Sequence, residues 1–100
     1  MNVTITSEGS KTLVKFEGRL DTTNAAQFQE DIAPLMALSN PDIDIDCTDM
    51  EYTSSQGLRM LLMLQKKVLQ SSGAMVMRNM RSSVKEVFDI TGFSNIIKII

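Results

Sequence analysis

The sequence predicts an α/β fold built on a mixed β-sheet. Short segments in which apolar and polar residues alternate predict strands, and longer segments with apolar residues three or four apart predict helices. The two kinds of segment alternate along most of the 100-residue chain, which is typical of a largely parallel sheet covered by helices. A hairpin at the N-terminus is expected to add an antiparallel part. The expected order is β-β-α-β-α-β-α-β.

Five segments are predicted to be strands. The first two, Val3–Thr6 and Leu13–Glu17, are separated by a turn that contains glycine, which favours an antiparallel hairpin. Ile43–Cys47 alternates strictly and is too short for a helix. The last two strands are expected at Ala74–Met77 and Ile96–Ile100.

Three segments are predicted to be helices. The apolar stripe of the first consists of Ala25, Phe28, Ile32, Leu35 and Met36. Pro34 lies inside it and should kink or weaken the helix, and Asn40–Pro41 marks its end. The longest candidate is Ser54–Gln70. The run Ser83–Glu86 matches a capping box, which predicts a third helix that continues to Ile90.

The second predicted helix has two faces of different character. At 100° per residue the buried face is expected to hold Leu58, Leu61, Leu62, Val68 and Leu69. Met60, Met63 and Lys67 should face outward, with Arg59 at the edge of that face. Two flexible apolar side chains on an outward face indicate a binding surface, although scattered surface methionines are also common.

Composition favours a globular protein of the cytoplasm. The sequence is 43% hydrophobic and 22% charged, and its net charge of -2 offers no general attraction to nucleic acid or anionic lipid. No apolar run is long enough to insert in a membrane, and the first residues lack the design of a signal peptide. The single Cys47 has no partner for an internal disulfide and is expected to be a small buried side chain.

The sequence contains no histidine, which argues against an enzyme. Without histidine, and with one cysteine, the usual metal sites and histidine-activated nucleophiles are not available. We therefore expect no catalytic residue, no metal and no cofactor. A nucleotide-binding domain is a weaker alternative, because the sequence has no glycine-rich phosphate loop with lysine.

Two polar segments precede predicted helices and have simple structural explanations. Thr53 followed by Gln56 three residues later predicts a capping box with Thr53 as the N-cap. Asp21 is predicted to cap the first helix.

Three motifs in order resemble the STAS domain. They are Gly18–Asp21 before the first helix, Tyr52–Arg59 at the start of the second, and Val84–Phe93 in the third helix and its exit. The similarity covers nearly the whole chain, and bacterial anti-sigma factor antagonists are the branch that the motifs match best. The resemblance implies a STAS-type mixed sheet and a single STAS domain over residues 1–100.

The resemblance also implies a partner-switching function. Such proteins bind an anti-sigma factor, often itself a serine kinase, and are released when a serine is phosphorylated; a serine phosphatase restores binding. Aligned on Gly57 and Leu58, that serine is Ser55, while Ser54 replaces the aspartate of the common motif. The alternative is a STAS accessory subunit of a larger transporter or signalling assembly, which is not phosphorylated.

The surface that contacts the partner is expected to surround Ser55, and the chain is expected to be a monomer or a weak homodimer. The residues assigned to that surface are Asp21, Thr22, Thr53, Ser54, Ser55, Gln56, Arg59, Met60 and Met63.

Overall fold

A computed structural model describes residues 1–100 and has the predicted order of strands and helices. Its one sheet has the strand order β1-β2-β3-β4-β5. β1 and β2 pair antiparallel, and each of the other neighbouring pairs is parallel. The strands are β1 (Asn2–Glu8), β2 (Lys11–Leu20), β3 (Asp42–Thr53), β4 (Ala74–Arg78) and β5 (Lys98–Ile99).

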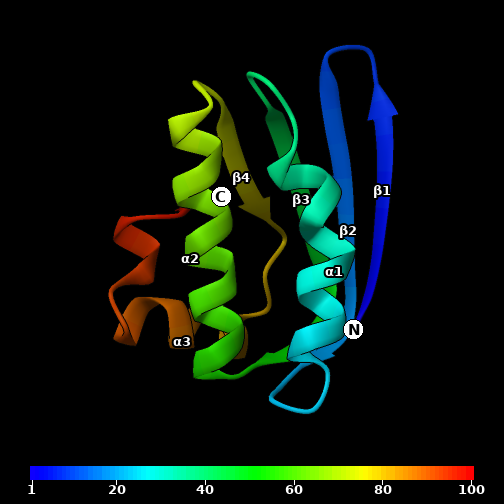
Figure 1. Ribbon diagram of the computed structural model, residues 1–100. Helices are drawn as coiled ribbons and strands as arrows, with labels where there is room; N and C mark the ends of the chain where they lie inside the picture. Colours follow the sequence, from blue (N-terminus) through cyan, green and yellow to red (C-terminus); the bar gives the residue numbers. More distant parts are fainter.

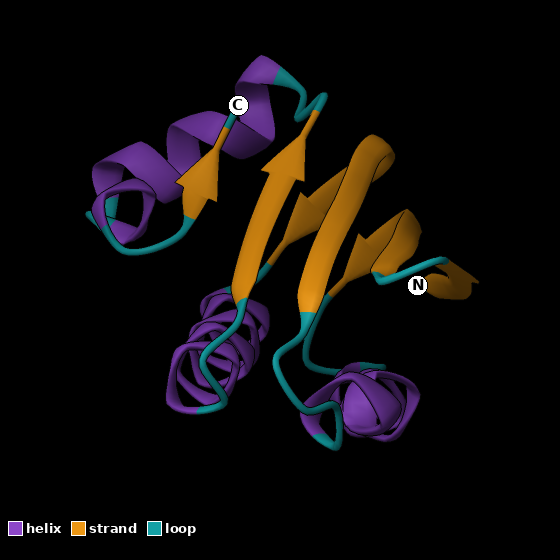
Figure 2. Ribbon diagram, turned by 90° about the horizontal axis from the view of Figure 1, so that it is seen from above, coloured by secondary structure: helices purple, strands orange, loops and turns teal.

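The helices are α1 (Ala25–Met36), α2 (Ser55–Gln70) and α3 (Ser82–Ile90), and a short 3-10 helix, η1, spans Phe93–Asn95. α1 and α2 lie side by side on one face of the sheet (Figure 1). Figure 2 shows both below the strands, with α3 and η1 at the end of the sheet that β5 forms. No helix is long and apolar enough to cross a membrane.

The core lies between the sheet and the helices. In β3, Ile43, Ile45 and Cys47 are buried, whereas Asp44 and Asp46 between them point to the opposite face and are partly exposed. This alternation is the reason that the segment forms a strand with one buried side. α1 closes the core over β2. There the rings of Phe16 and Phe28 pack edge to face, with 5.4 Å between the ring centres.

The strands differ in length from the prediction: β1, β2, β3 and β4 are longer, and β5 is shorter. β3 continues to Thr53 because its pairing with β2 shifts register twice, first between Lys15 and Glu17 and again between Gly18 and Arg19. The two shifts restore inward-facing positions at Met50 and Thr53. Such an irregularity interrupts the period of two that identifies a strand in the sequence. β5 is shorter than predicted because η1 comes just before it, and only Lys98 and Ile99 pair with β4.

The starts of α1 and α3 differ from the predicted caps. Asn24, and not Asp21, occupies the N-cap position of α1. α3 begins at Ser82, with Arg81 as an N-cap that makes no side-chain bond, so the predicted capping box at Ser83–Glu86 is wrong. The apolar stripe of α1 is confirmed, and the helix ends two residues after Pro34, whose nitrogen has no hydrogen to donate.

α2 is rotated about its axis relative to the prediction. Its buried residues are Gly57, Leu58, Leu61, Leu64, Gln65 and Val68. Leu64, absent from the predicted face, is fully buried, whereas Leu69 is 58% exposed and its predicted burial is wrong. The rotation carries Met60 toward α1, where it is half-buried against the core.

Cys47 is fully buried, as predicted, and burial raises the pKa of its thiol to about 12. The neighbouring Asp46 carboxylate acts in the same direction, because a second negative charge nearby disfavours the thiolate. The side chain is therefore both inaccessible and protonated near neutral pH. Because the thiolate is the reactive form of cysteine, we expect Cys47 to be unreactive in the native protein.

We therefore predict that Cys47 reacts slowly with a thiol reagent in the native protein between pH 7 and 9, and at the rate of a free thiol in denaturant. Stopped-flow or mass-spectrometric labelling at several urea concentrations measures both rates. Labelling of the native protein at the denatured rate would contradict the burial of this side chain.

Candidate functional site

The residues around Ser55 lie where β2 and β3 end. These strands are parallel, so their carboxyl ends meet at one edge of the sheet, with Leu20 opposite Thr53. The chain leaves β2 through a loop into α1 and leaves β3 directly into α2. The Ser54 amide donates a hydrogen bond of 2.8 Å to the Leu20 carbonyl, which joins the start of α2 to the end of β2.

Ser54 is the N-cap of α2. Its backbone is extended, its hydroxyl oxygen accepts a hydrogen bond of 3.2 Å from the Gly57 amide, and its carbonyl accepts one from Leu58. Thr53, the predicted cap, is the last residue of β3 and only 3% exposed. The prediction was wrong by one residue because pairing with Leu20 keeps Thr53 in the strand.

Gly57 allows the first turn of α2 to approach the sheet closely. A Cβ atom at this position would lie 2.7 Å from the Leu20 side chain and 2.7 Å from the Thr53 hydroxyl oxygen. Both distances are well inside van der Waals contact, so a larger residue would push the helix start away from the strands.

Ser55 and Ser54 differ in what their hydroxyl groups do. Ser54 is partly buried and its hydroxyl accepts the capping bond, whereas Ser55 is exposed and its hydroxyl makes no hydrogen bond within the chain. Gln56 is exposed beside Ser55. Arg59 follows Ser55 by four residues, so the two side chains share one exposed face of the helix.

The loop after β2 forms the other side of the site. The Asp21 carboxylate accepts hydrogen bonds from the Thr23 amide at 3.0 Å and the Thr23 hydroxyl at 2.5 Å, and these bonds hold the pKa of the Asp21 carboxyl below its ordinary value. The Asn24 side chain accepts a hydrogen bond from the Asp21 amide and donates one to the Arg19 carbonyl, and these two bonds stabilise the loop. Asp21 therefore shapes the loop and does not cap α1, while Thr22 is exposed beside it.

Sequence reasoning missed Arg19 and Tyr52 as neighbours of the site. The two residues are paired in register one position before Leu20 and Thr53, and the Arg19 guanidinium lies 4.3 Å from the centre of the Tyr52 ring. Both are exposed, and this cation–π pair extends the polar surface onto the sheet face opposite the helices. The signal available in the sequence was their place inside the motifs Gly18–Asp21 and Tyr52–Arg59.

The two methionines that were predicted to face outward differ from each other. Met63 is 54% exposed, as predicted. Met60 is only partly exposed, so its outward placement was wrong: the side chain lines an apolar hollow of about 40 Å³ between α1 and α2. The other residues around that hollow are Gln29, Ile32, Met36 and Met63.

The site is thus an exposed surface of hydroxyl, amide, carboxylate and guanidinium groups beside a helix start. These groups can bind another macromolecule by hydrogen bonds and charge. The free hydroxyl of Ser55 can also accept a phosphoryl group, because the unpaired amides and positive dipole of a helix N-terminus tolerate an anion.

Comparisons with known proteins agree on one family. Residues 2–100 match the STAS domain family. BtrV of Bordetella bronchiseptica, named as a candidate anti-sigma factor antagonist, is 28% identical over 96% of this chain and 83% of its own. The anti-sigma-B factor antagonist of Bacillus subtilis is 29% identical over 99% of this chain and 90% of its own.

Solved structures show the same fold. A candidate anti-sigma factor antagonist from Thermotoga maritima superposes with a TM-score of 0.85 at 20% identity, covering 97% of this chain and 84% of that one. The phosphorylated form of the Bacillus cell fate determinant SpoIIAA superposes with a TM-score of 0.71 at 14% identity, covering 99% of this chain and 91% of that one.

The different roles of the two serines predict different costs of substitution. Ser54→Ala removes the capping oxygen and should lower the free energy of unfolding by about 1 kcal/mol. Ser55→Ala removes an exposed, unbonded hydroxyl and should change it by less than about 0.5 kcal/mol. Urea unfolding followed by circular dichroism compares the two, and a larger loss for Ser55→Ala would contradict the capping geometry.

Proposed function

The chain belongs to the STAS domain family, and from that premise we propose that it is an anti-sigma factor antagonist. It acts by reversible binding to an anti-sigma factor in the cytoplasm, without catalysis of its own. The anti-sigma factor, or a kinase associated with it, phosphorylates Ser55, and a serine phosphatase reverses the modification.

The relatives support this proposal. The Bacillus subtilis protein is named for antagonism of anti-sigma-B factor, and its similarity to this chain extends over nearly the full length of both. SpoIIAA has been solved in a phosphorylated and an unphosphorylated form. Phosphorylation is therefore compatible with this fold.

The observation that supports Ser55 most strongly is its free hydroxyl in the first turn of α2. A kinase must reach the oxygen that it modifies, and the Ser55 oxygen is exposed and unbonded. The hydroxyl of Ser54 is engaged by the Gly57 amide, and Thr53 is buried. Of the three adjacent hydroxyl groups, only that of Ser55 is available without disturbing the helix start.

A phosphoryl group on Ser55 would act on docking and leave the fold intact. It adds nearly two negative charges and three oxygens that bind water strongly. The helix N-terminus and Arg59, one turn away, tolerate these charges in the free protein. A partner that covers Ser55 must remove the water bound to the phosphoryl oxygens, or place its own negative groups near these charges. Either effect weakens binding.

The surface around Ser55 would supply the contacts with the partner. Asp21, Thr22, Ser54, Gln56, Arg59 and Met63 are at least partly exposed and belong to this surface. Thr53 is too deeply buried to contact a partner directly and supports the surface from beneath. Met60 contributes mainly through the hollow that it forms with α1.

We predict that Ser55→Asp keeps the thermal midpoint of the wild type and loses the partner. Losing about 3 kcal/mol of binding free energy corresponds to a weakening of about a hundredfold. Affinity capture from extracts of the source organism, with the wild type and Ser55→Asp side by side, identifies the partner by mass spectrometry. Titration with the purified anti-sigma factor then measures this difference in affinity.

Two further variants complete the experiment. Ser55→Ala should bind the anti-sigma factor and resist release by ATP, whereas Ser54→Ala should still be phosphorylated at Ser55. Modification of Ser54 or Thr53 in place of Ser55 would sink the assignment of the site. Equal binding by Ser55→Asp and the wild type would instead indicate a permanently docked accessory subunit.

A further inference from the structure

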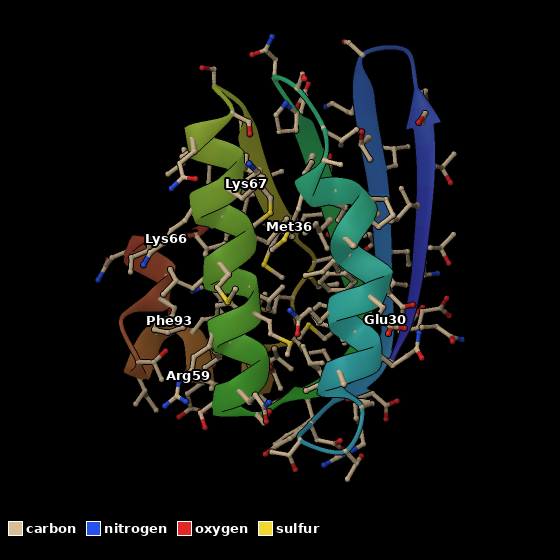
Figure 3. The ribbon with its side chains drawn as sticks, viewed as in Figure 1. Glu30, Met36, Arg59, Lys66, Lys67 and Phe93 are labelled. Atoms are coloured by element: carbon tan, nitrogen blue, oxygen red, sulfur yellow. The ribbon has the colours of Figure 1, made fainter.

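The outward face of α2 carries basic side chains without any acidic counterpart. The helix contains Arg59, Lys66 and Lys67 and no Asp or Glu, in a chain whose net charge is -2. All three basic side chains are exposed. Figure 3 shows Arg59 and Lys66 along the side of α2 and Lys67 near its upper end.

Interactions within the protein do not account for this charge. The three ion pairs of the structure join Lys15 to Asp49, Arg78 to Asp44 and Lys85 to Asp89, and none involves α2. The helix dipole favours Lys67 in the last turn, but the first turn has no acidic residue, although the dipole would favour one there. No ion pair within the chain therefore neutralises the positive charges of α2.

The basic face borders the apolar hollow between α1 and α2. Met63 lies both on the outward face of α2 and in the wall of that hollow, opposite Met36 of α1. In Figure 3 Met36 lies between the two helices. At about 40 Å³ the hollow admits the end of one apolar side chain, and methionine side chains adapt readily to such a guest.

We propose that this face of α2 docks an acidic amphipathic helix of the anti-sigma factor. The inference rests on the proposed function and extends its surface from Ser55 to the far end of α2. An apolar residue of the partner helix enters the hollow, and its acidic residues lie along Arg59, Lys66 and Lys67. This arrangement is the helix-in-groove mode of recognition, with one apolar anchor flanked by complementary charges.

The neighbouring helix argues for a protein partner and against a lipid surface. α1 exposes Glu30 and holds Asp31 partly exposed, and Figure 3 shows Glu30 on the side of α1 away from α2. A broad anionic membrane would meet these carboxylates together with the three basic residues. A narrow acidic helix can follow α2 alone and so avoids the carboxylates of α1.

The test is a charge reversal at the end of α2 that lies outside the Ser55 site. Lys66→Glu/Lys67→Glu is compared with Lys11→Glu/Lys98→Glu, which changes the same number of exposed lysines on β2 and β5. The probe is the purified anti-sigma factor recovered with the wild-type protein. We expect the α2 variant to bind about tenfold more weakly than the control at ~50 mM salt. The difference in affinity should become smaller at ~500 mM salt, because salt screens the charges.

The outcomes separate this inference from the proposed function. If the wild type binds the anti-sigma factor and the two double variants bind equally, the acidic-helix proposal is overturned while the proposed function stands. If no anti-sigma factor binds the wild type, both are overturned. Loss of binding to phosphatidylserine vesicles, with unchanged binding to the anti-sigma factor, would assign the basic face to a membrane and also overturn the proposal.

A second variant guards against an effect on folding. Lys66→Gln/Lys67→Gln removes the charges without reversing them and should weaken binding about threefold at ~50 mM salt with an unchanged thermal midpoint. Wild-type affinity of this neutral variant at low salt would overturn the proposal even if the reversed variant were unstable.

Discussion

The close packing of the α2 start against the ends of β2 and β3 positions the whole candidate site. The Ser54 amide bonds to the Leu20 carbonyl, and Gly57 leaves no space between the helix and the Leu20 side chain. Once these contacts are made, Ser54 must cap the helix and Ser55 must point to solvent. The loop that holds Asp21 follows Leu20 directly, so it lies beside Ser55.

The same contact sets the rotation of α2 and divides its residues between structure and binding. With Gly57 against the sheet, Leu61, Leu64 and Val68 follow on the buried face. The opposite face then displays Ser55, Arg59 and the two lysines of the last turns. The helix is therefore both the central element of the core and the surface that a partner would meet, and its outward residues can change without cost to the fold.

The fold could be predicted from the sequence because local patterns and global architecture agree. The alternation in β3 and the apolar stripe of α1 each identified an element, and the three motifs located the site. The wrong predictions concern helix caps and the buried face of α2, which tertiary contacts determine. Pairing with Leu20 moved the cap from Thr53 to Ser54, and the loop bonds of Asp21 excluded it from capping. α2, packed on the sheet at Gly57, buries Leu64 and exposes Leu69, so the predicted phase of the helix was wrong although Leu58, Leu61, Leu64 and Val68 lie at helical spacing.

The most direct test of this account is the stability of Gly57→Ala, compared with Gln56→Ala at the exposed neighbouring position. Alanine favours a helix over glycine by about 1 kcal/mol, whereas forcing a methyl group into a packed contact costs about 1–3 kcal/mol. Urea unfolding should therefore show Gly57→Ala to be less stable than the wild type, with Gln56→Ala unchanged or slightly more stable. A Gly57→Ala protein that matches or exceeds the wild type would show that the helix start does not depend on this close approach.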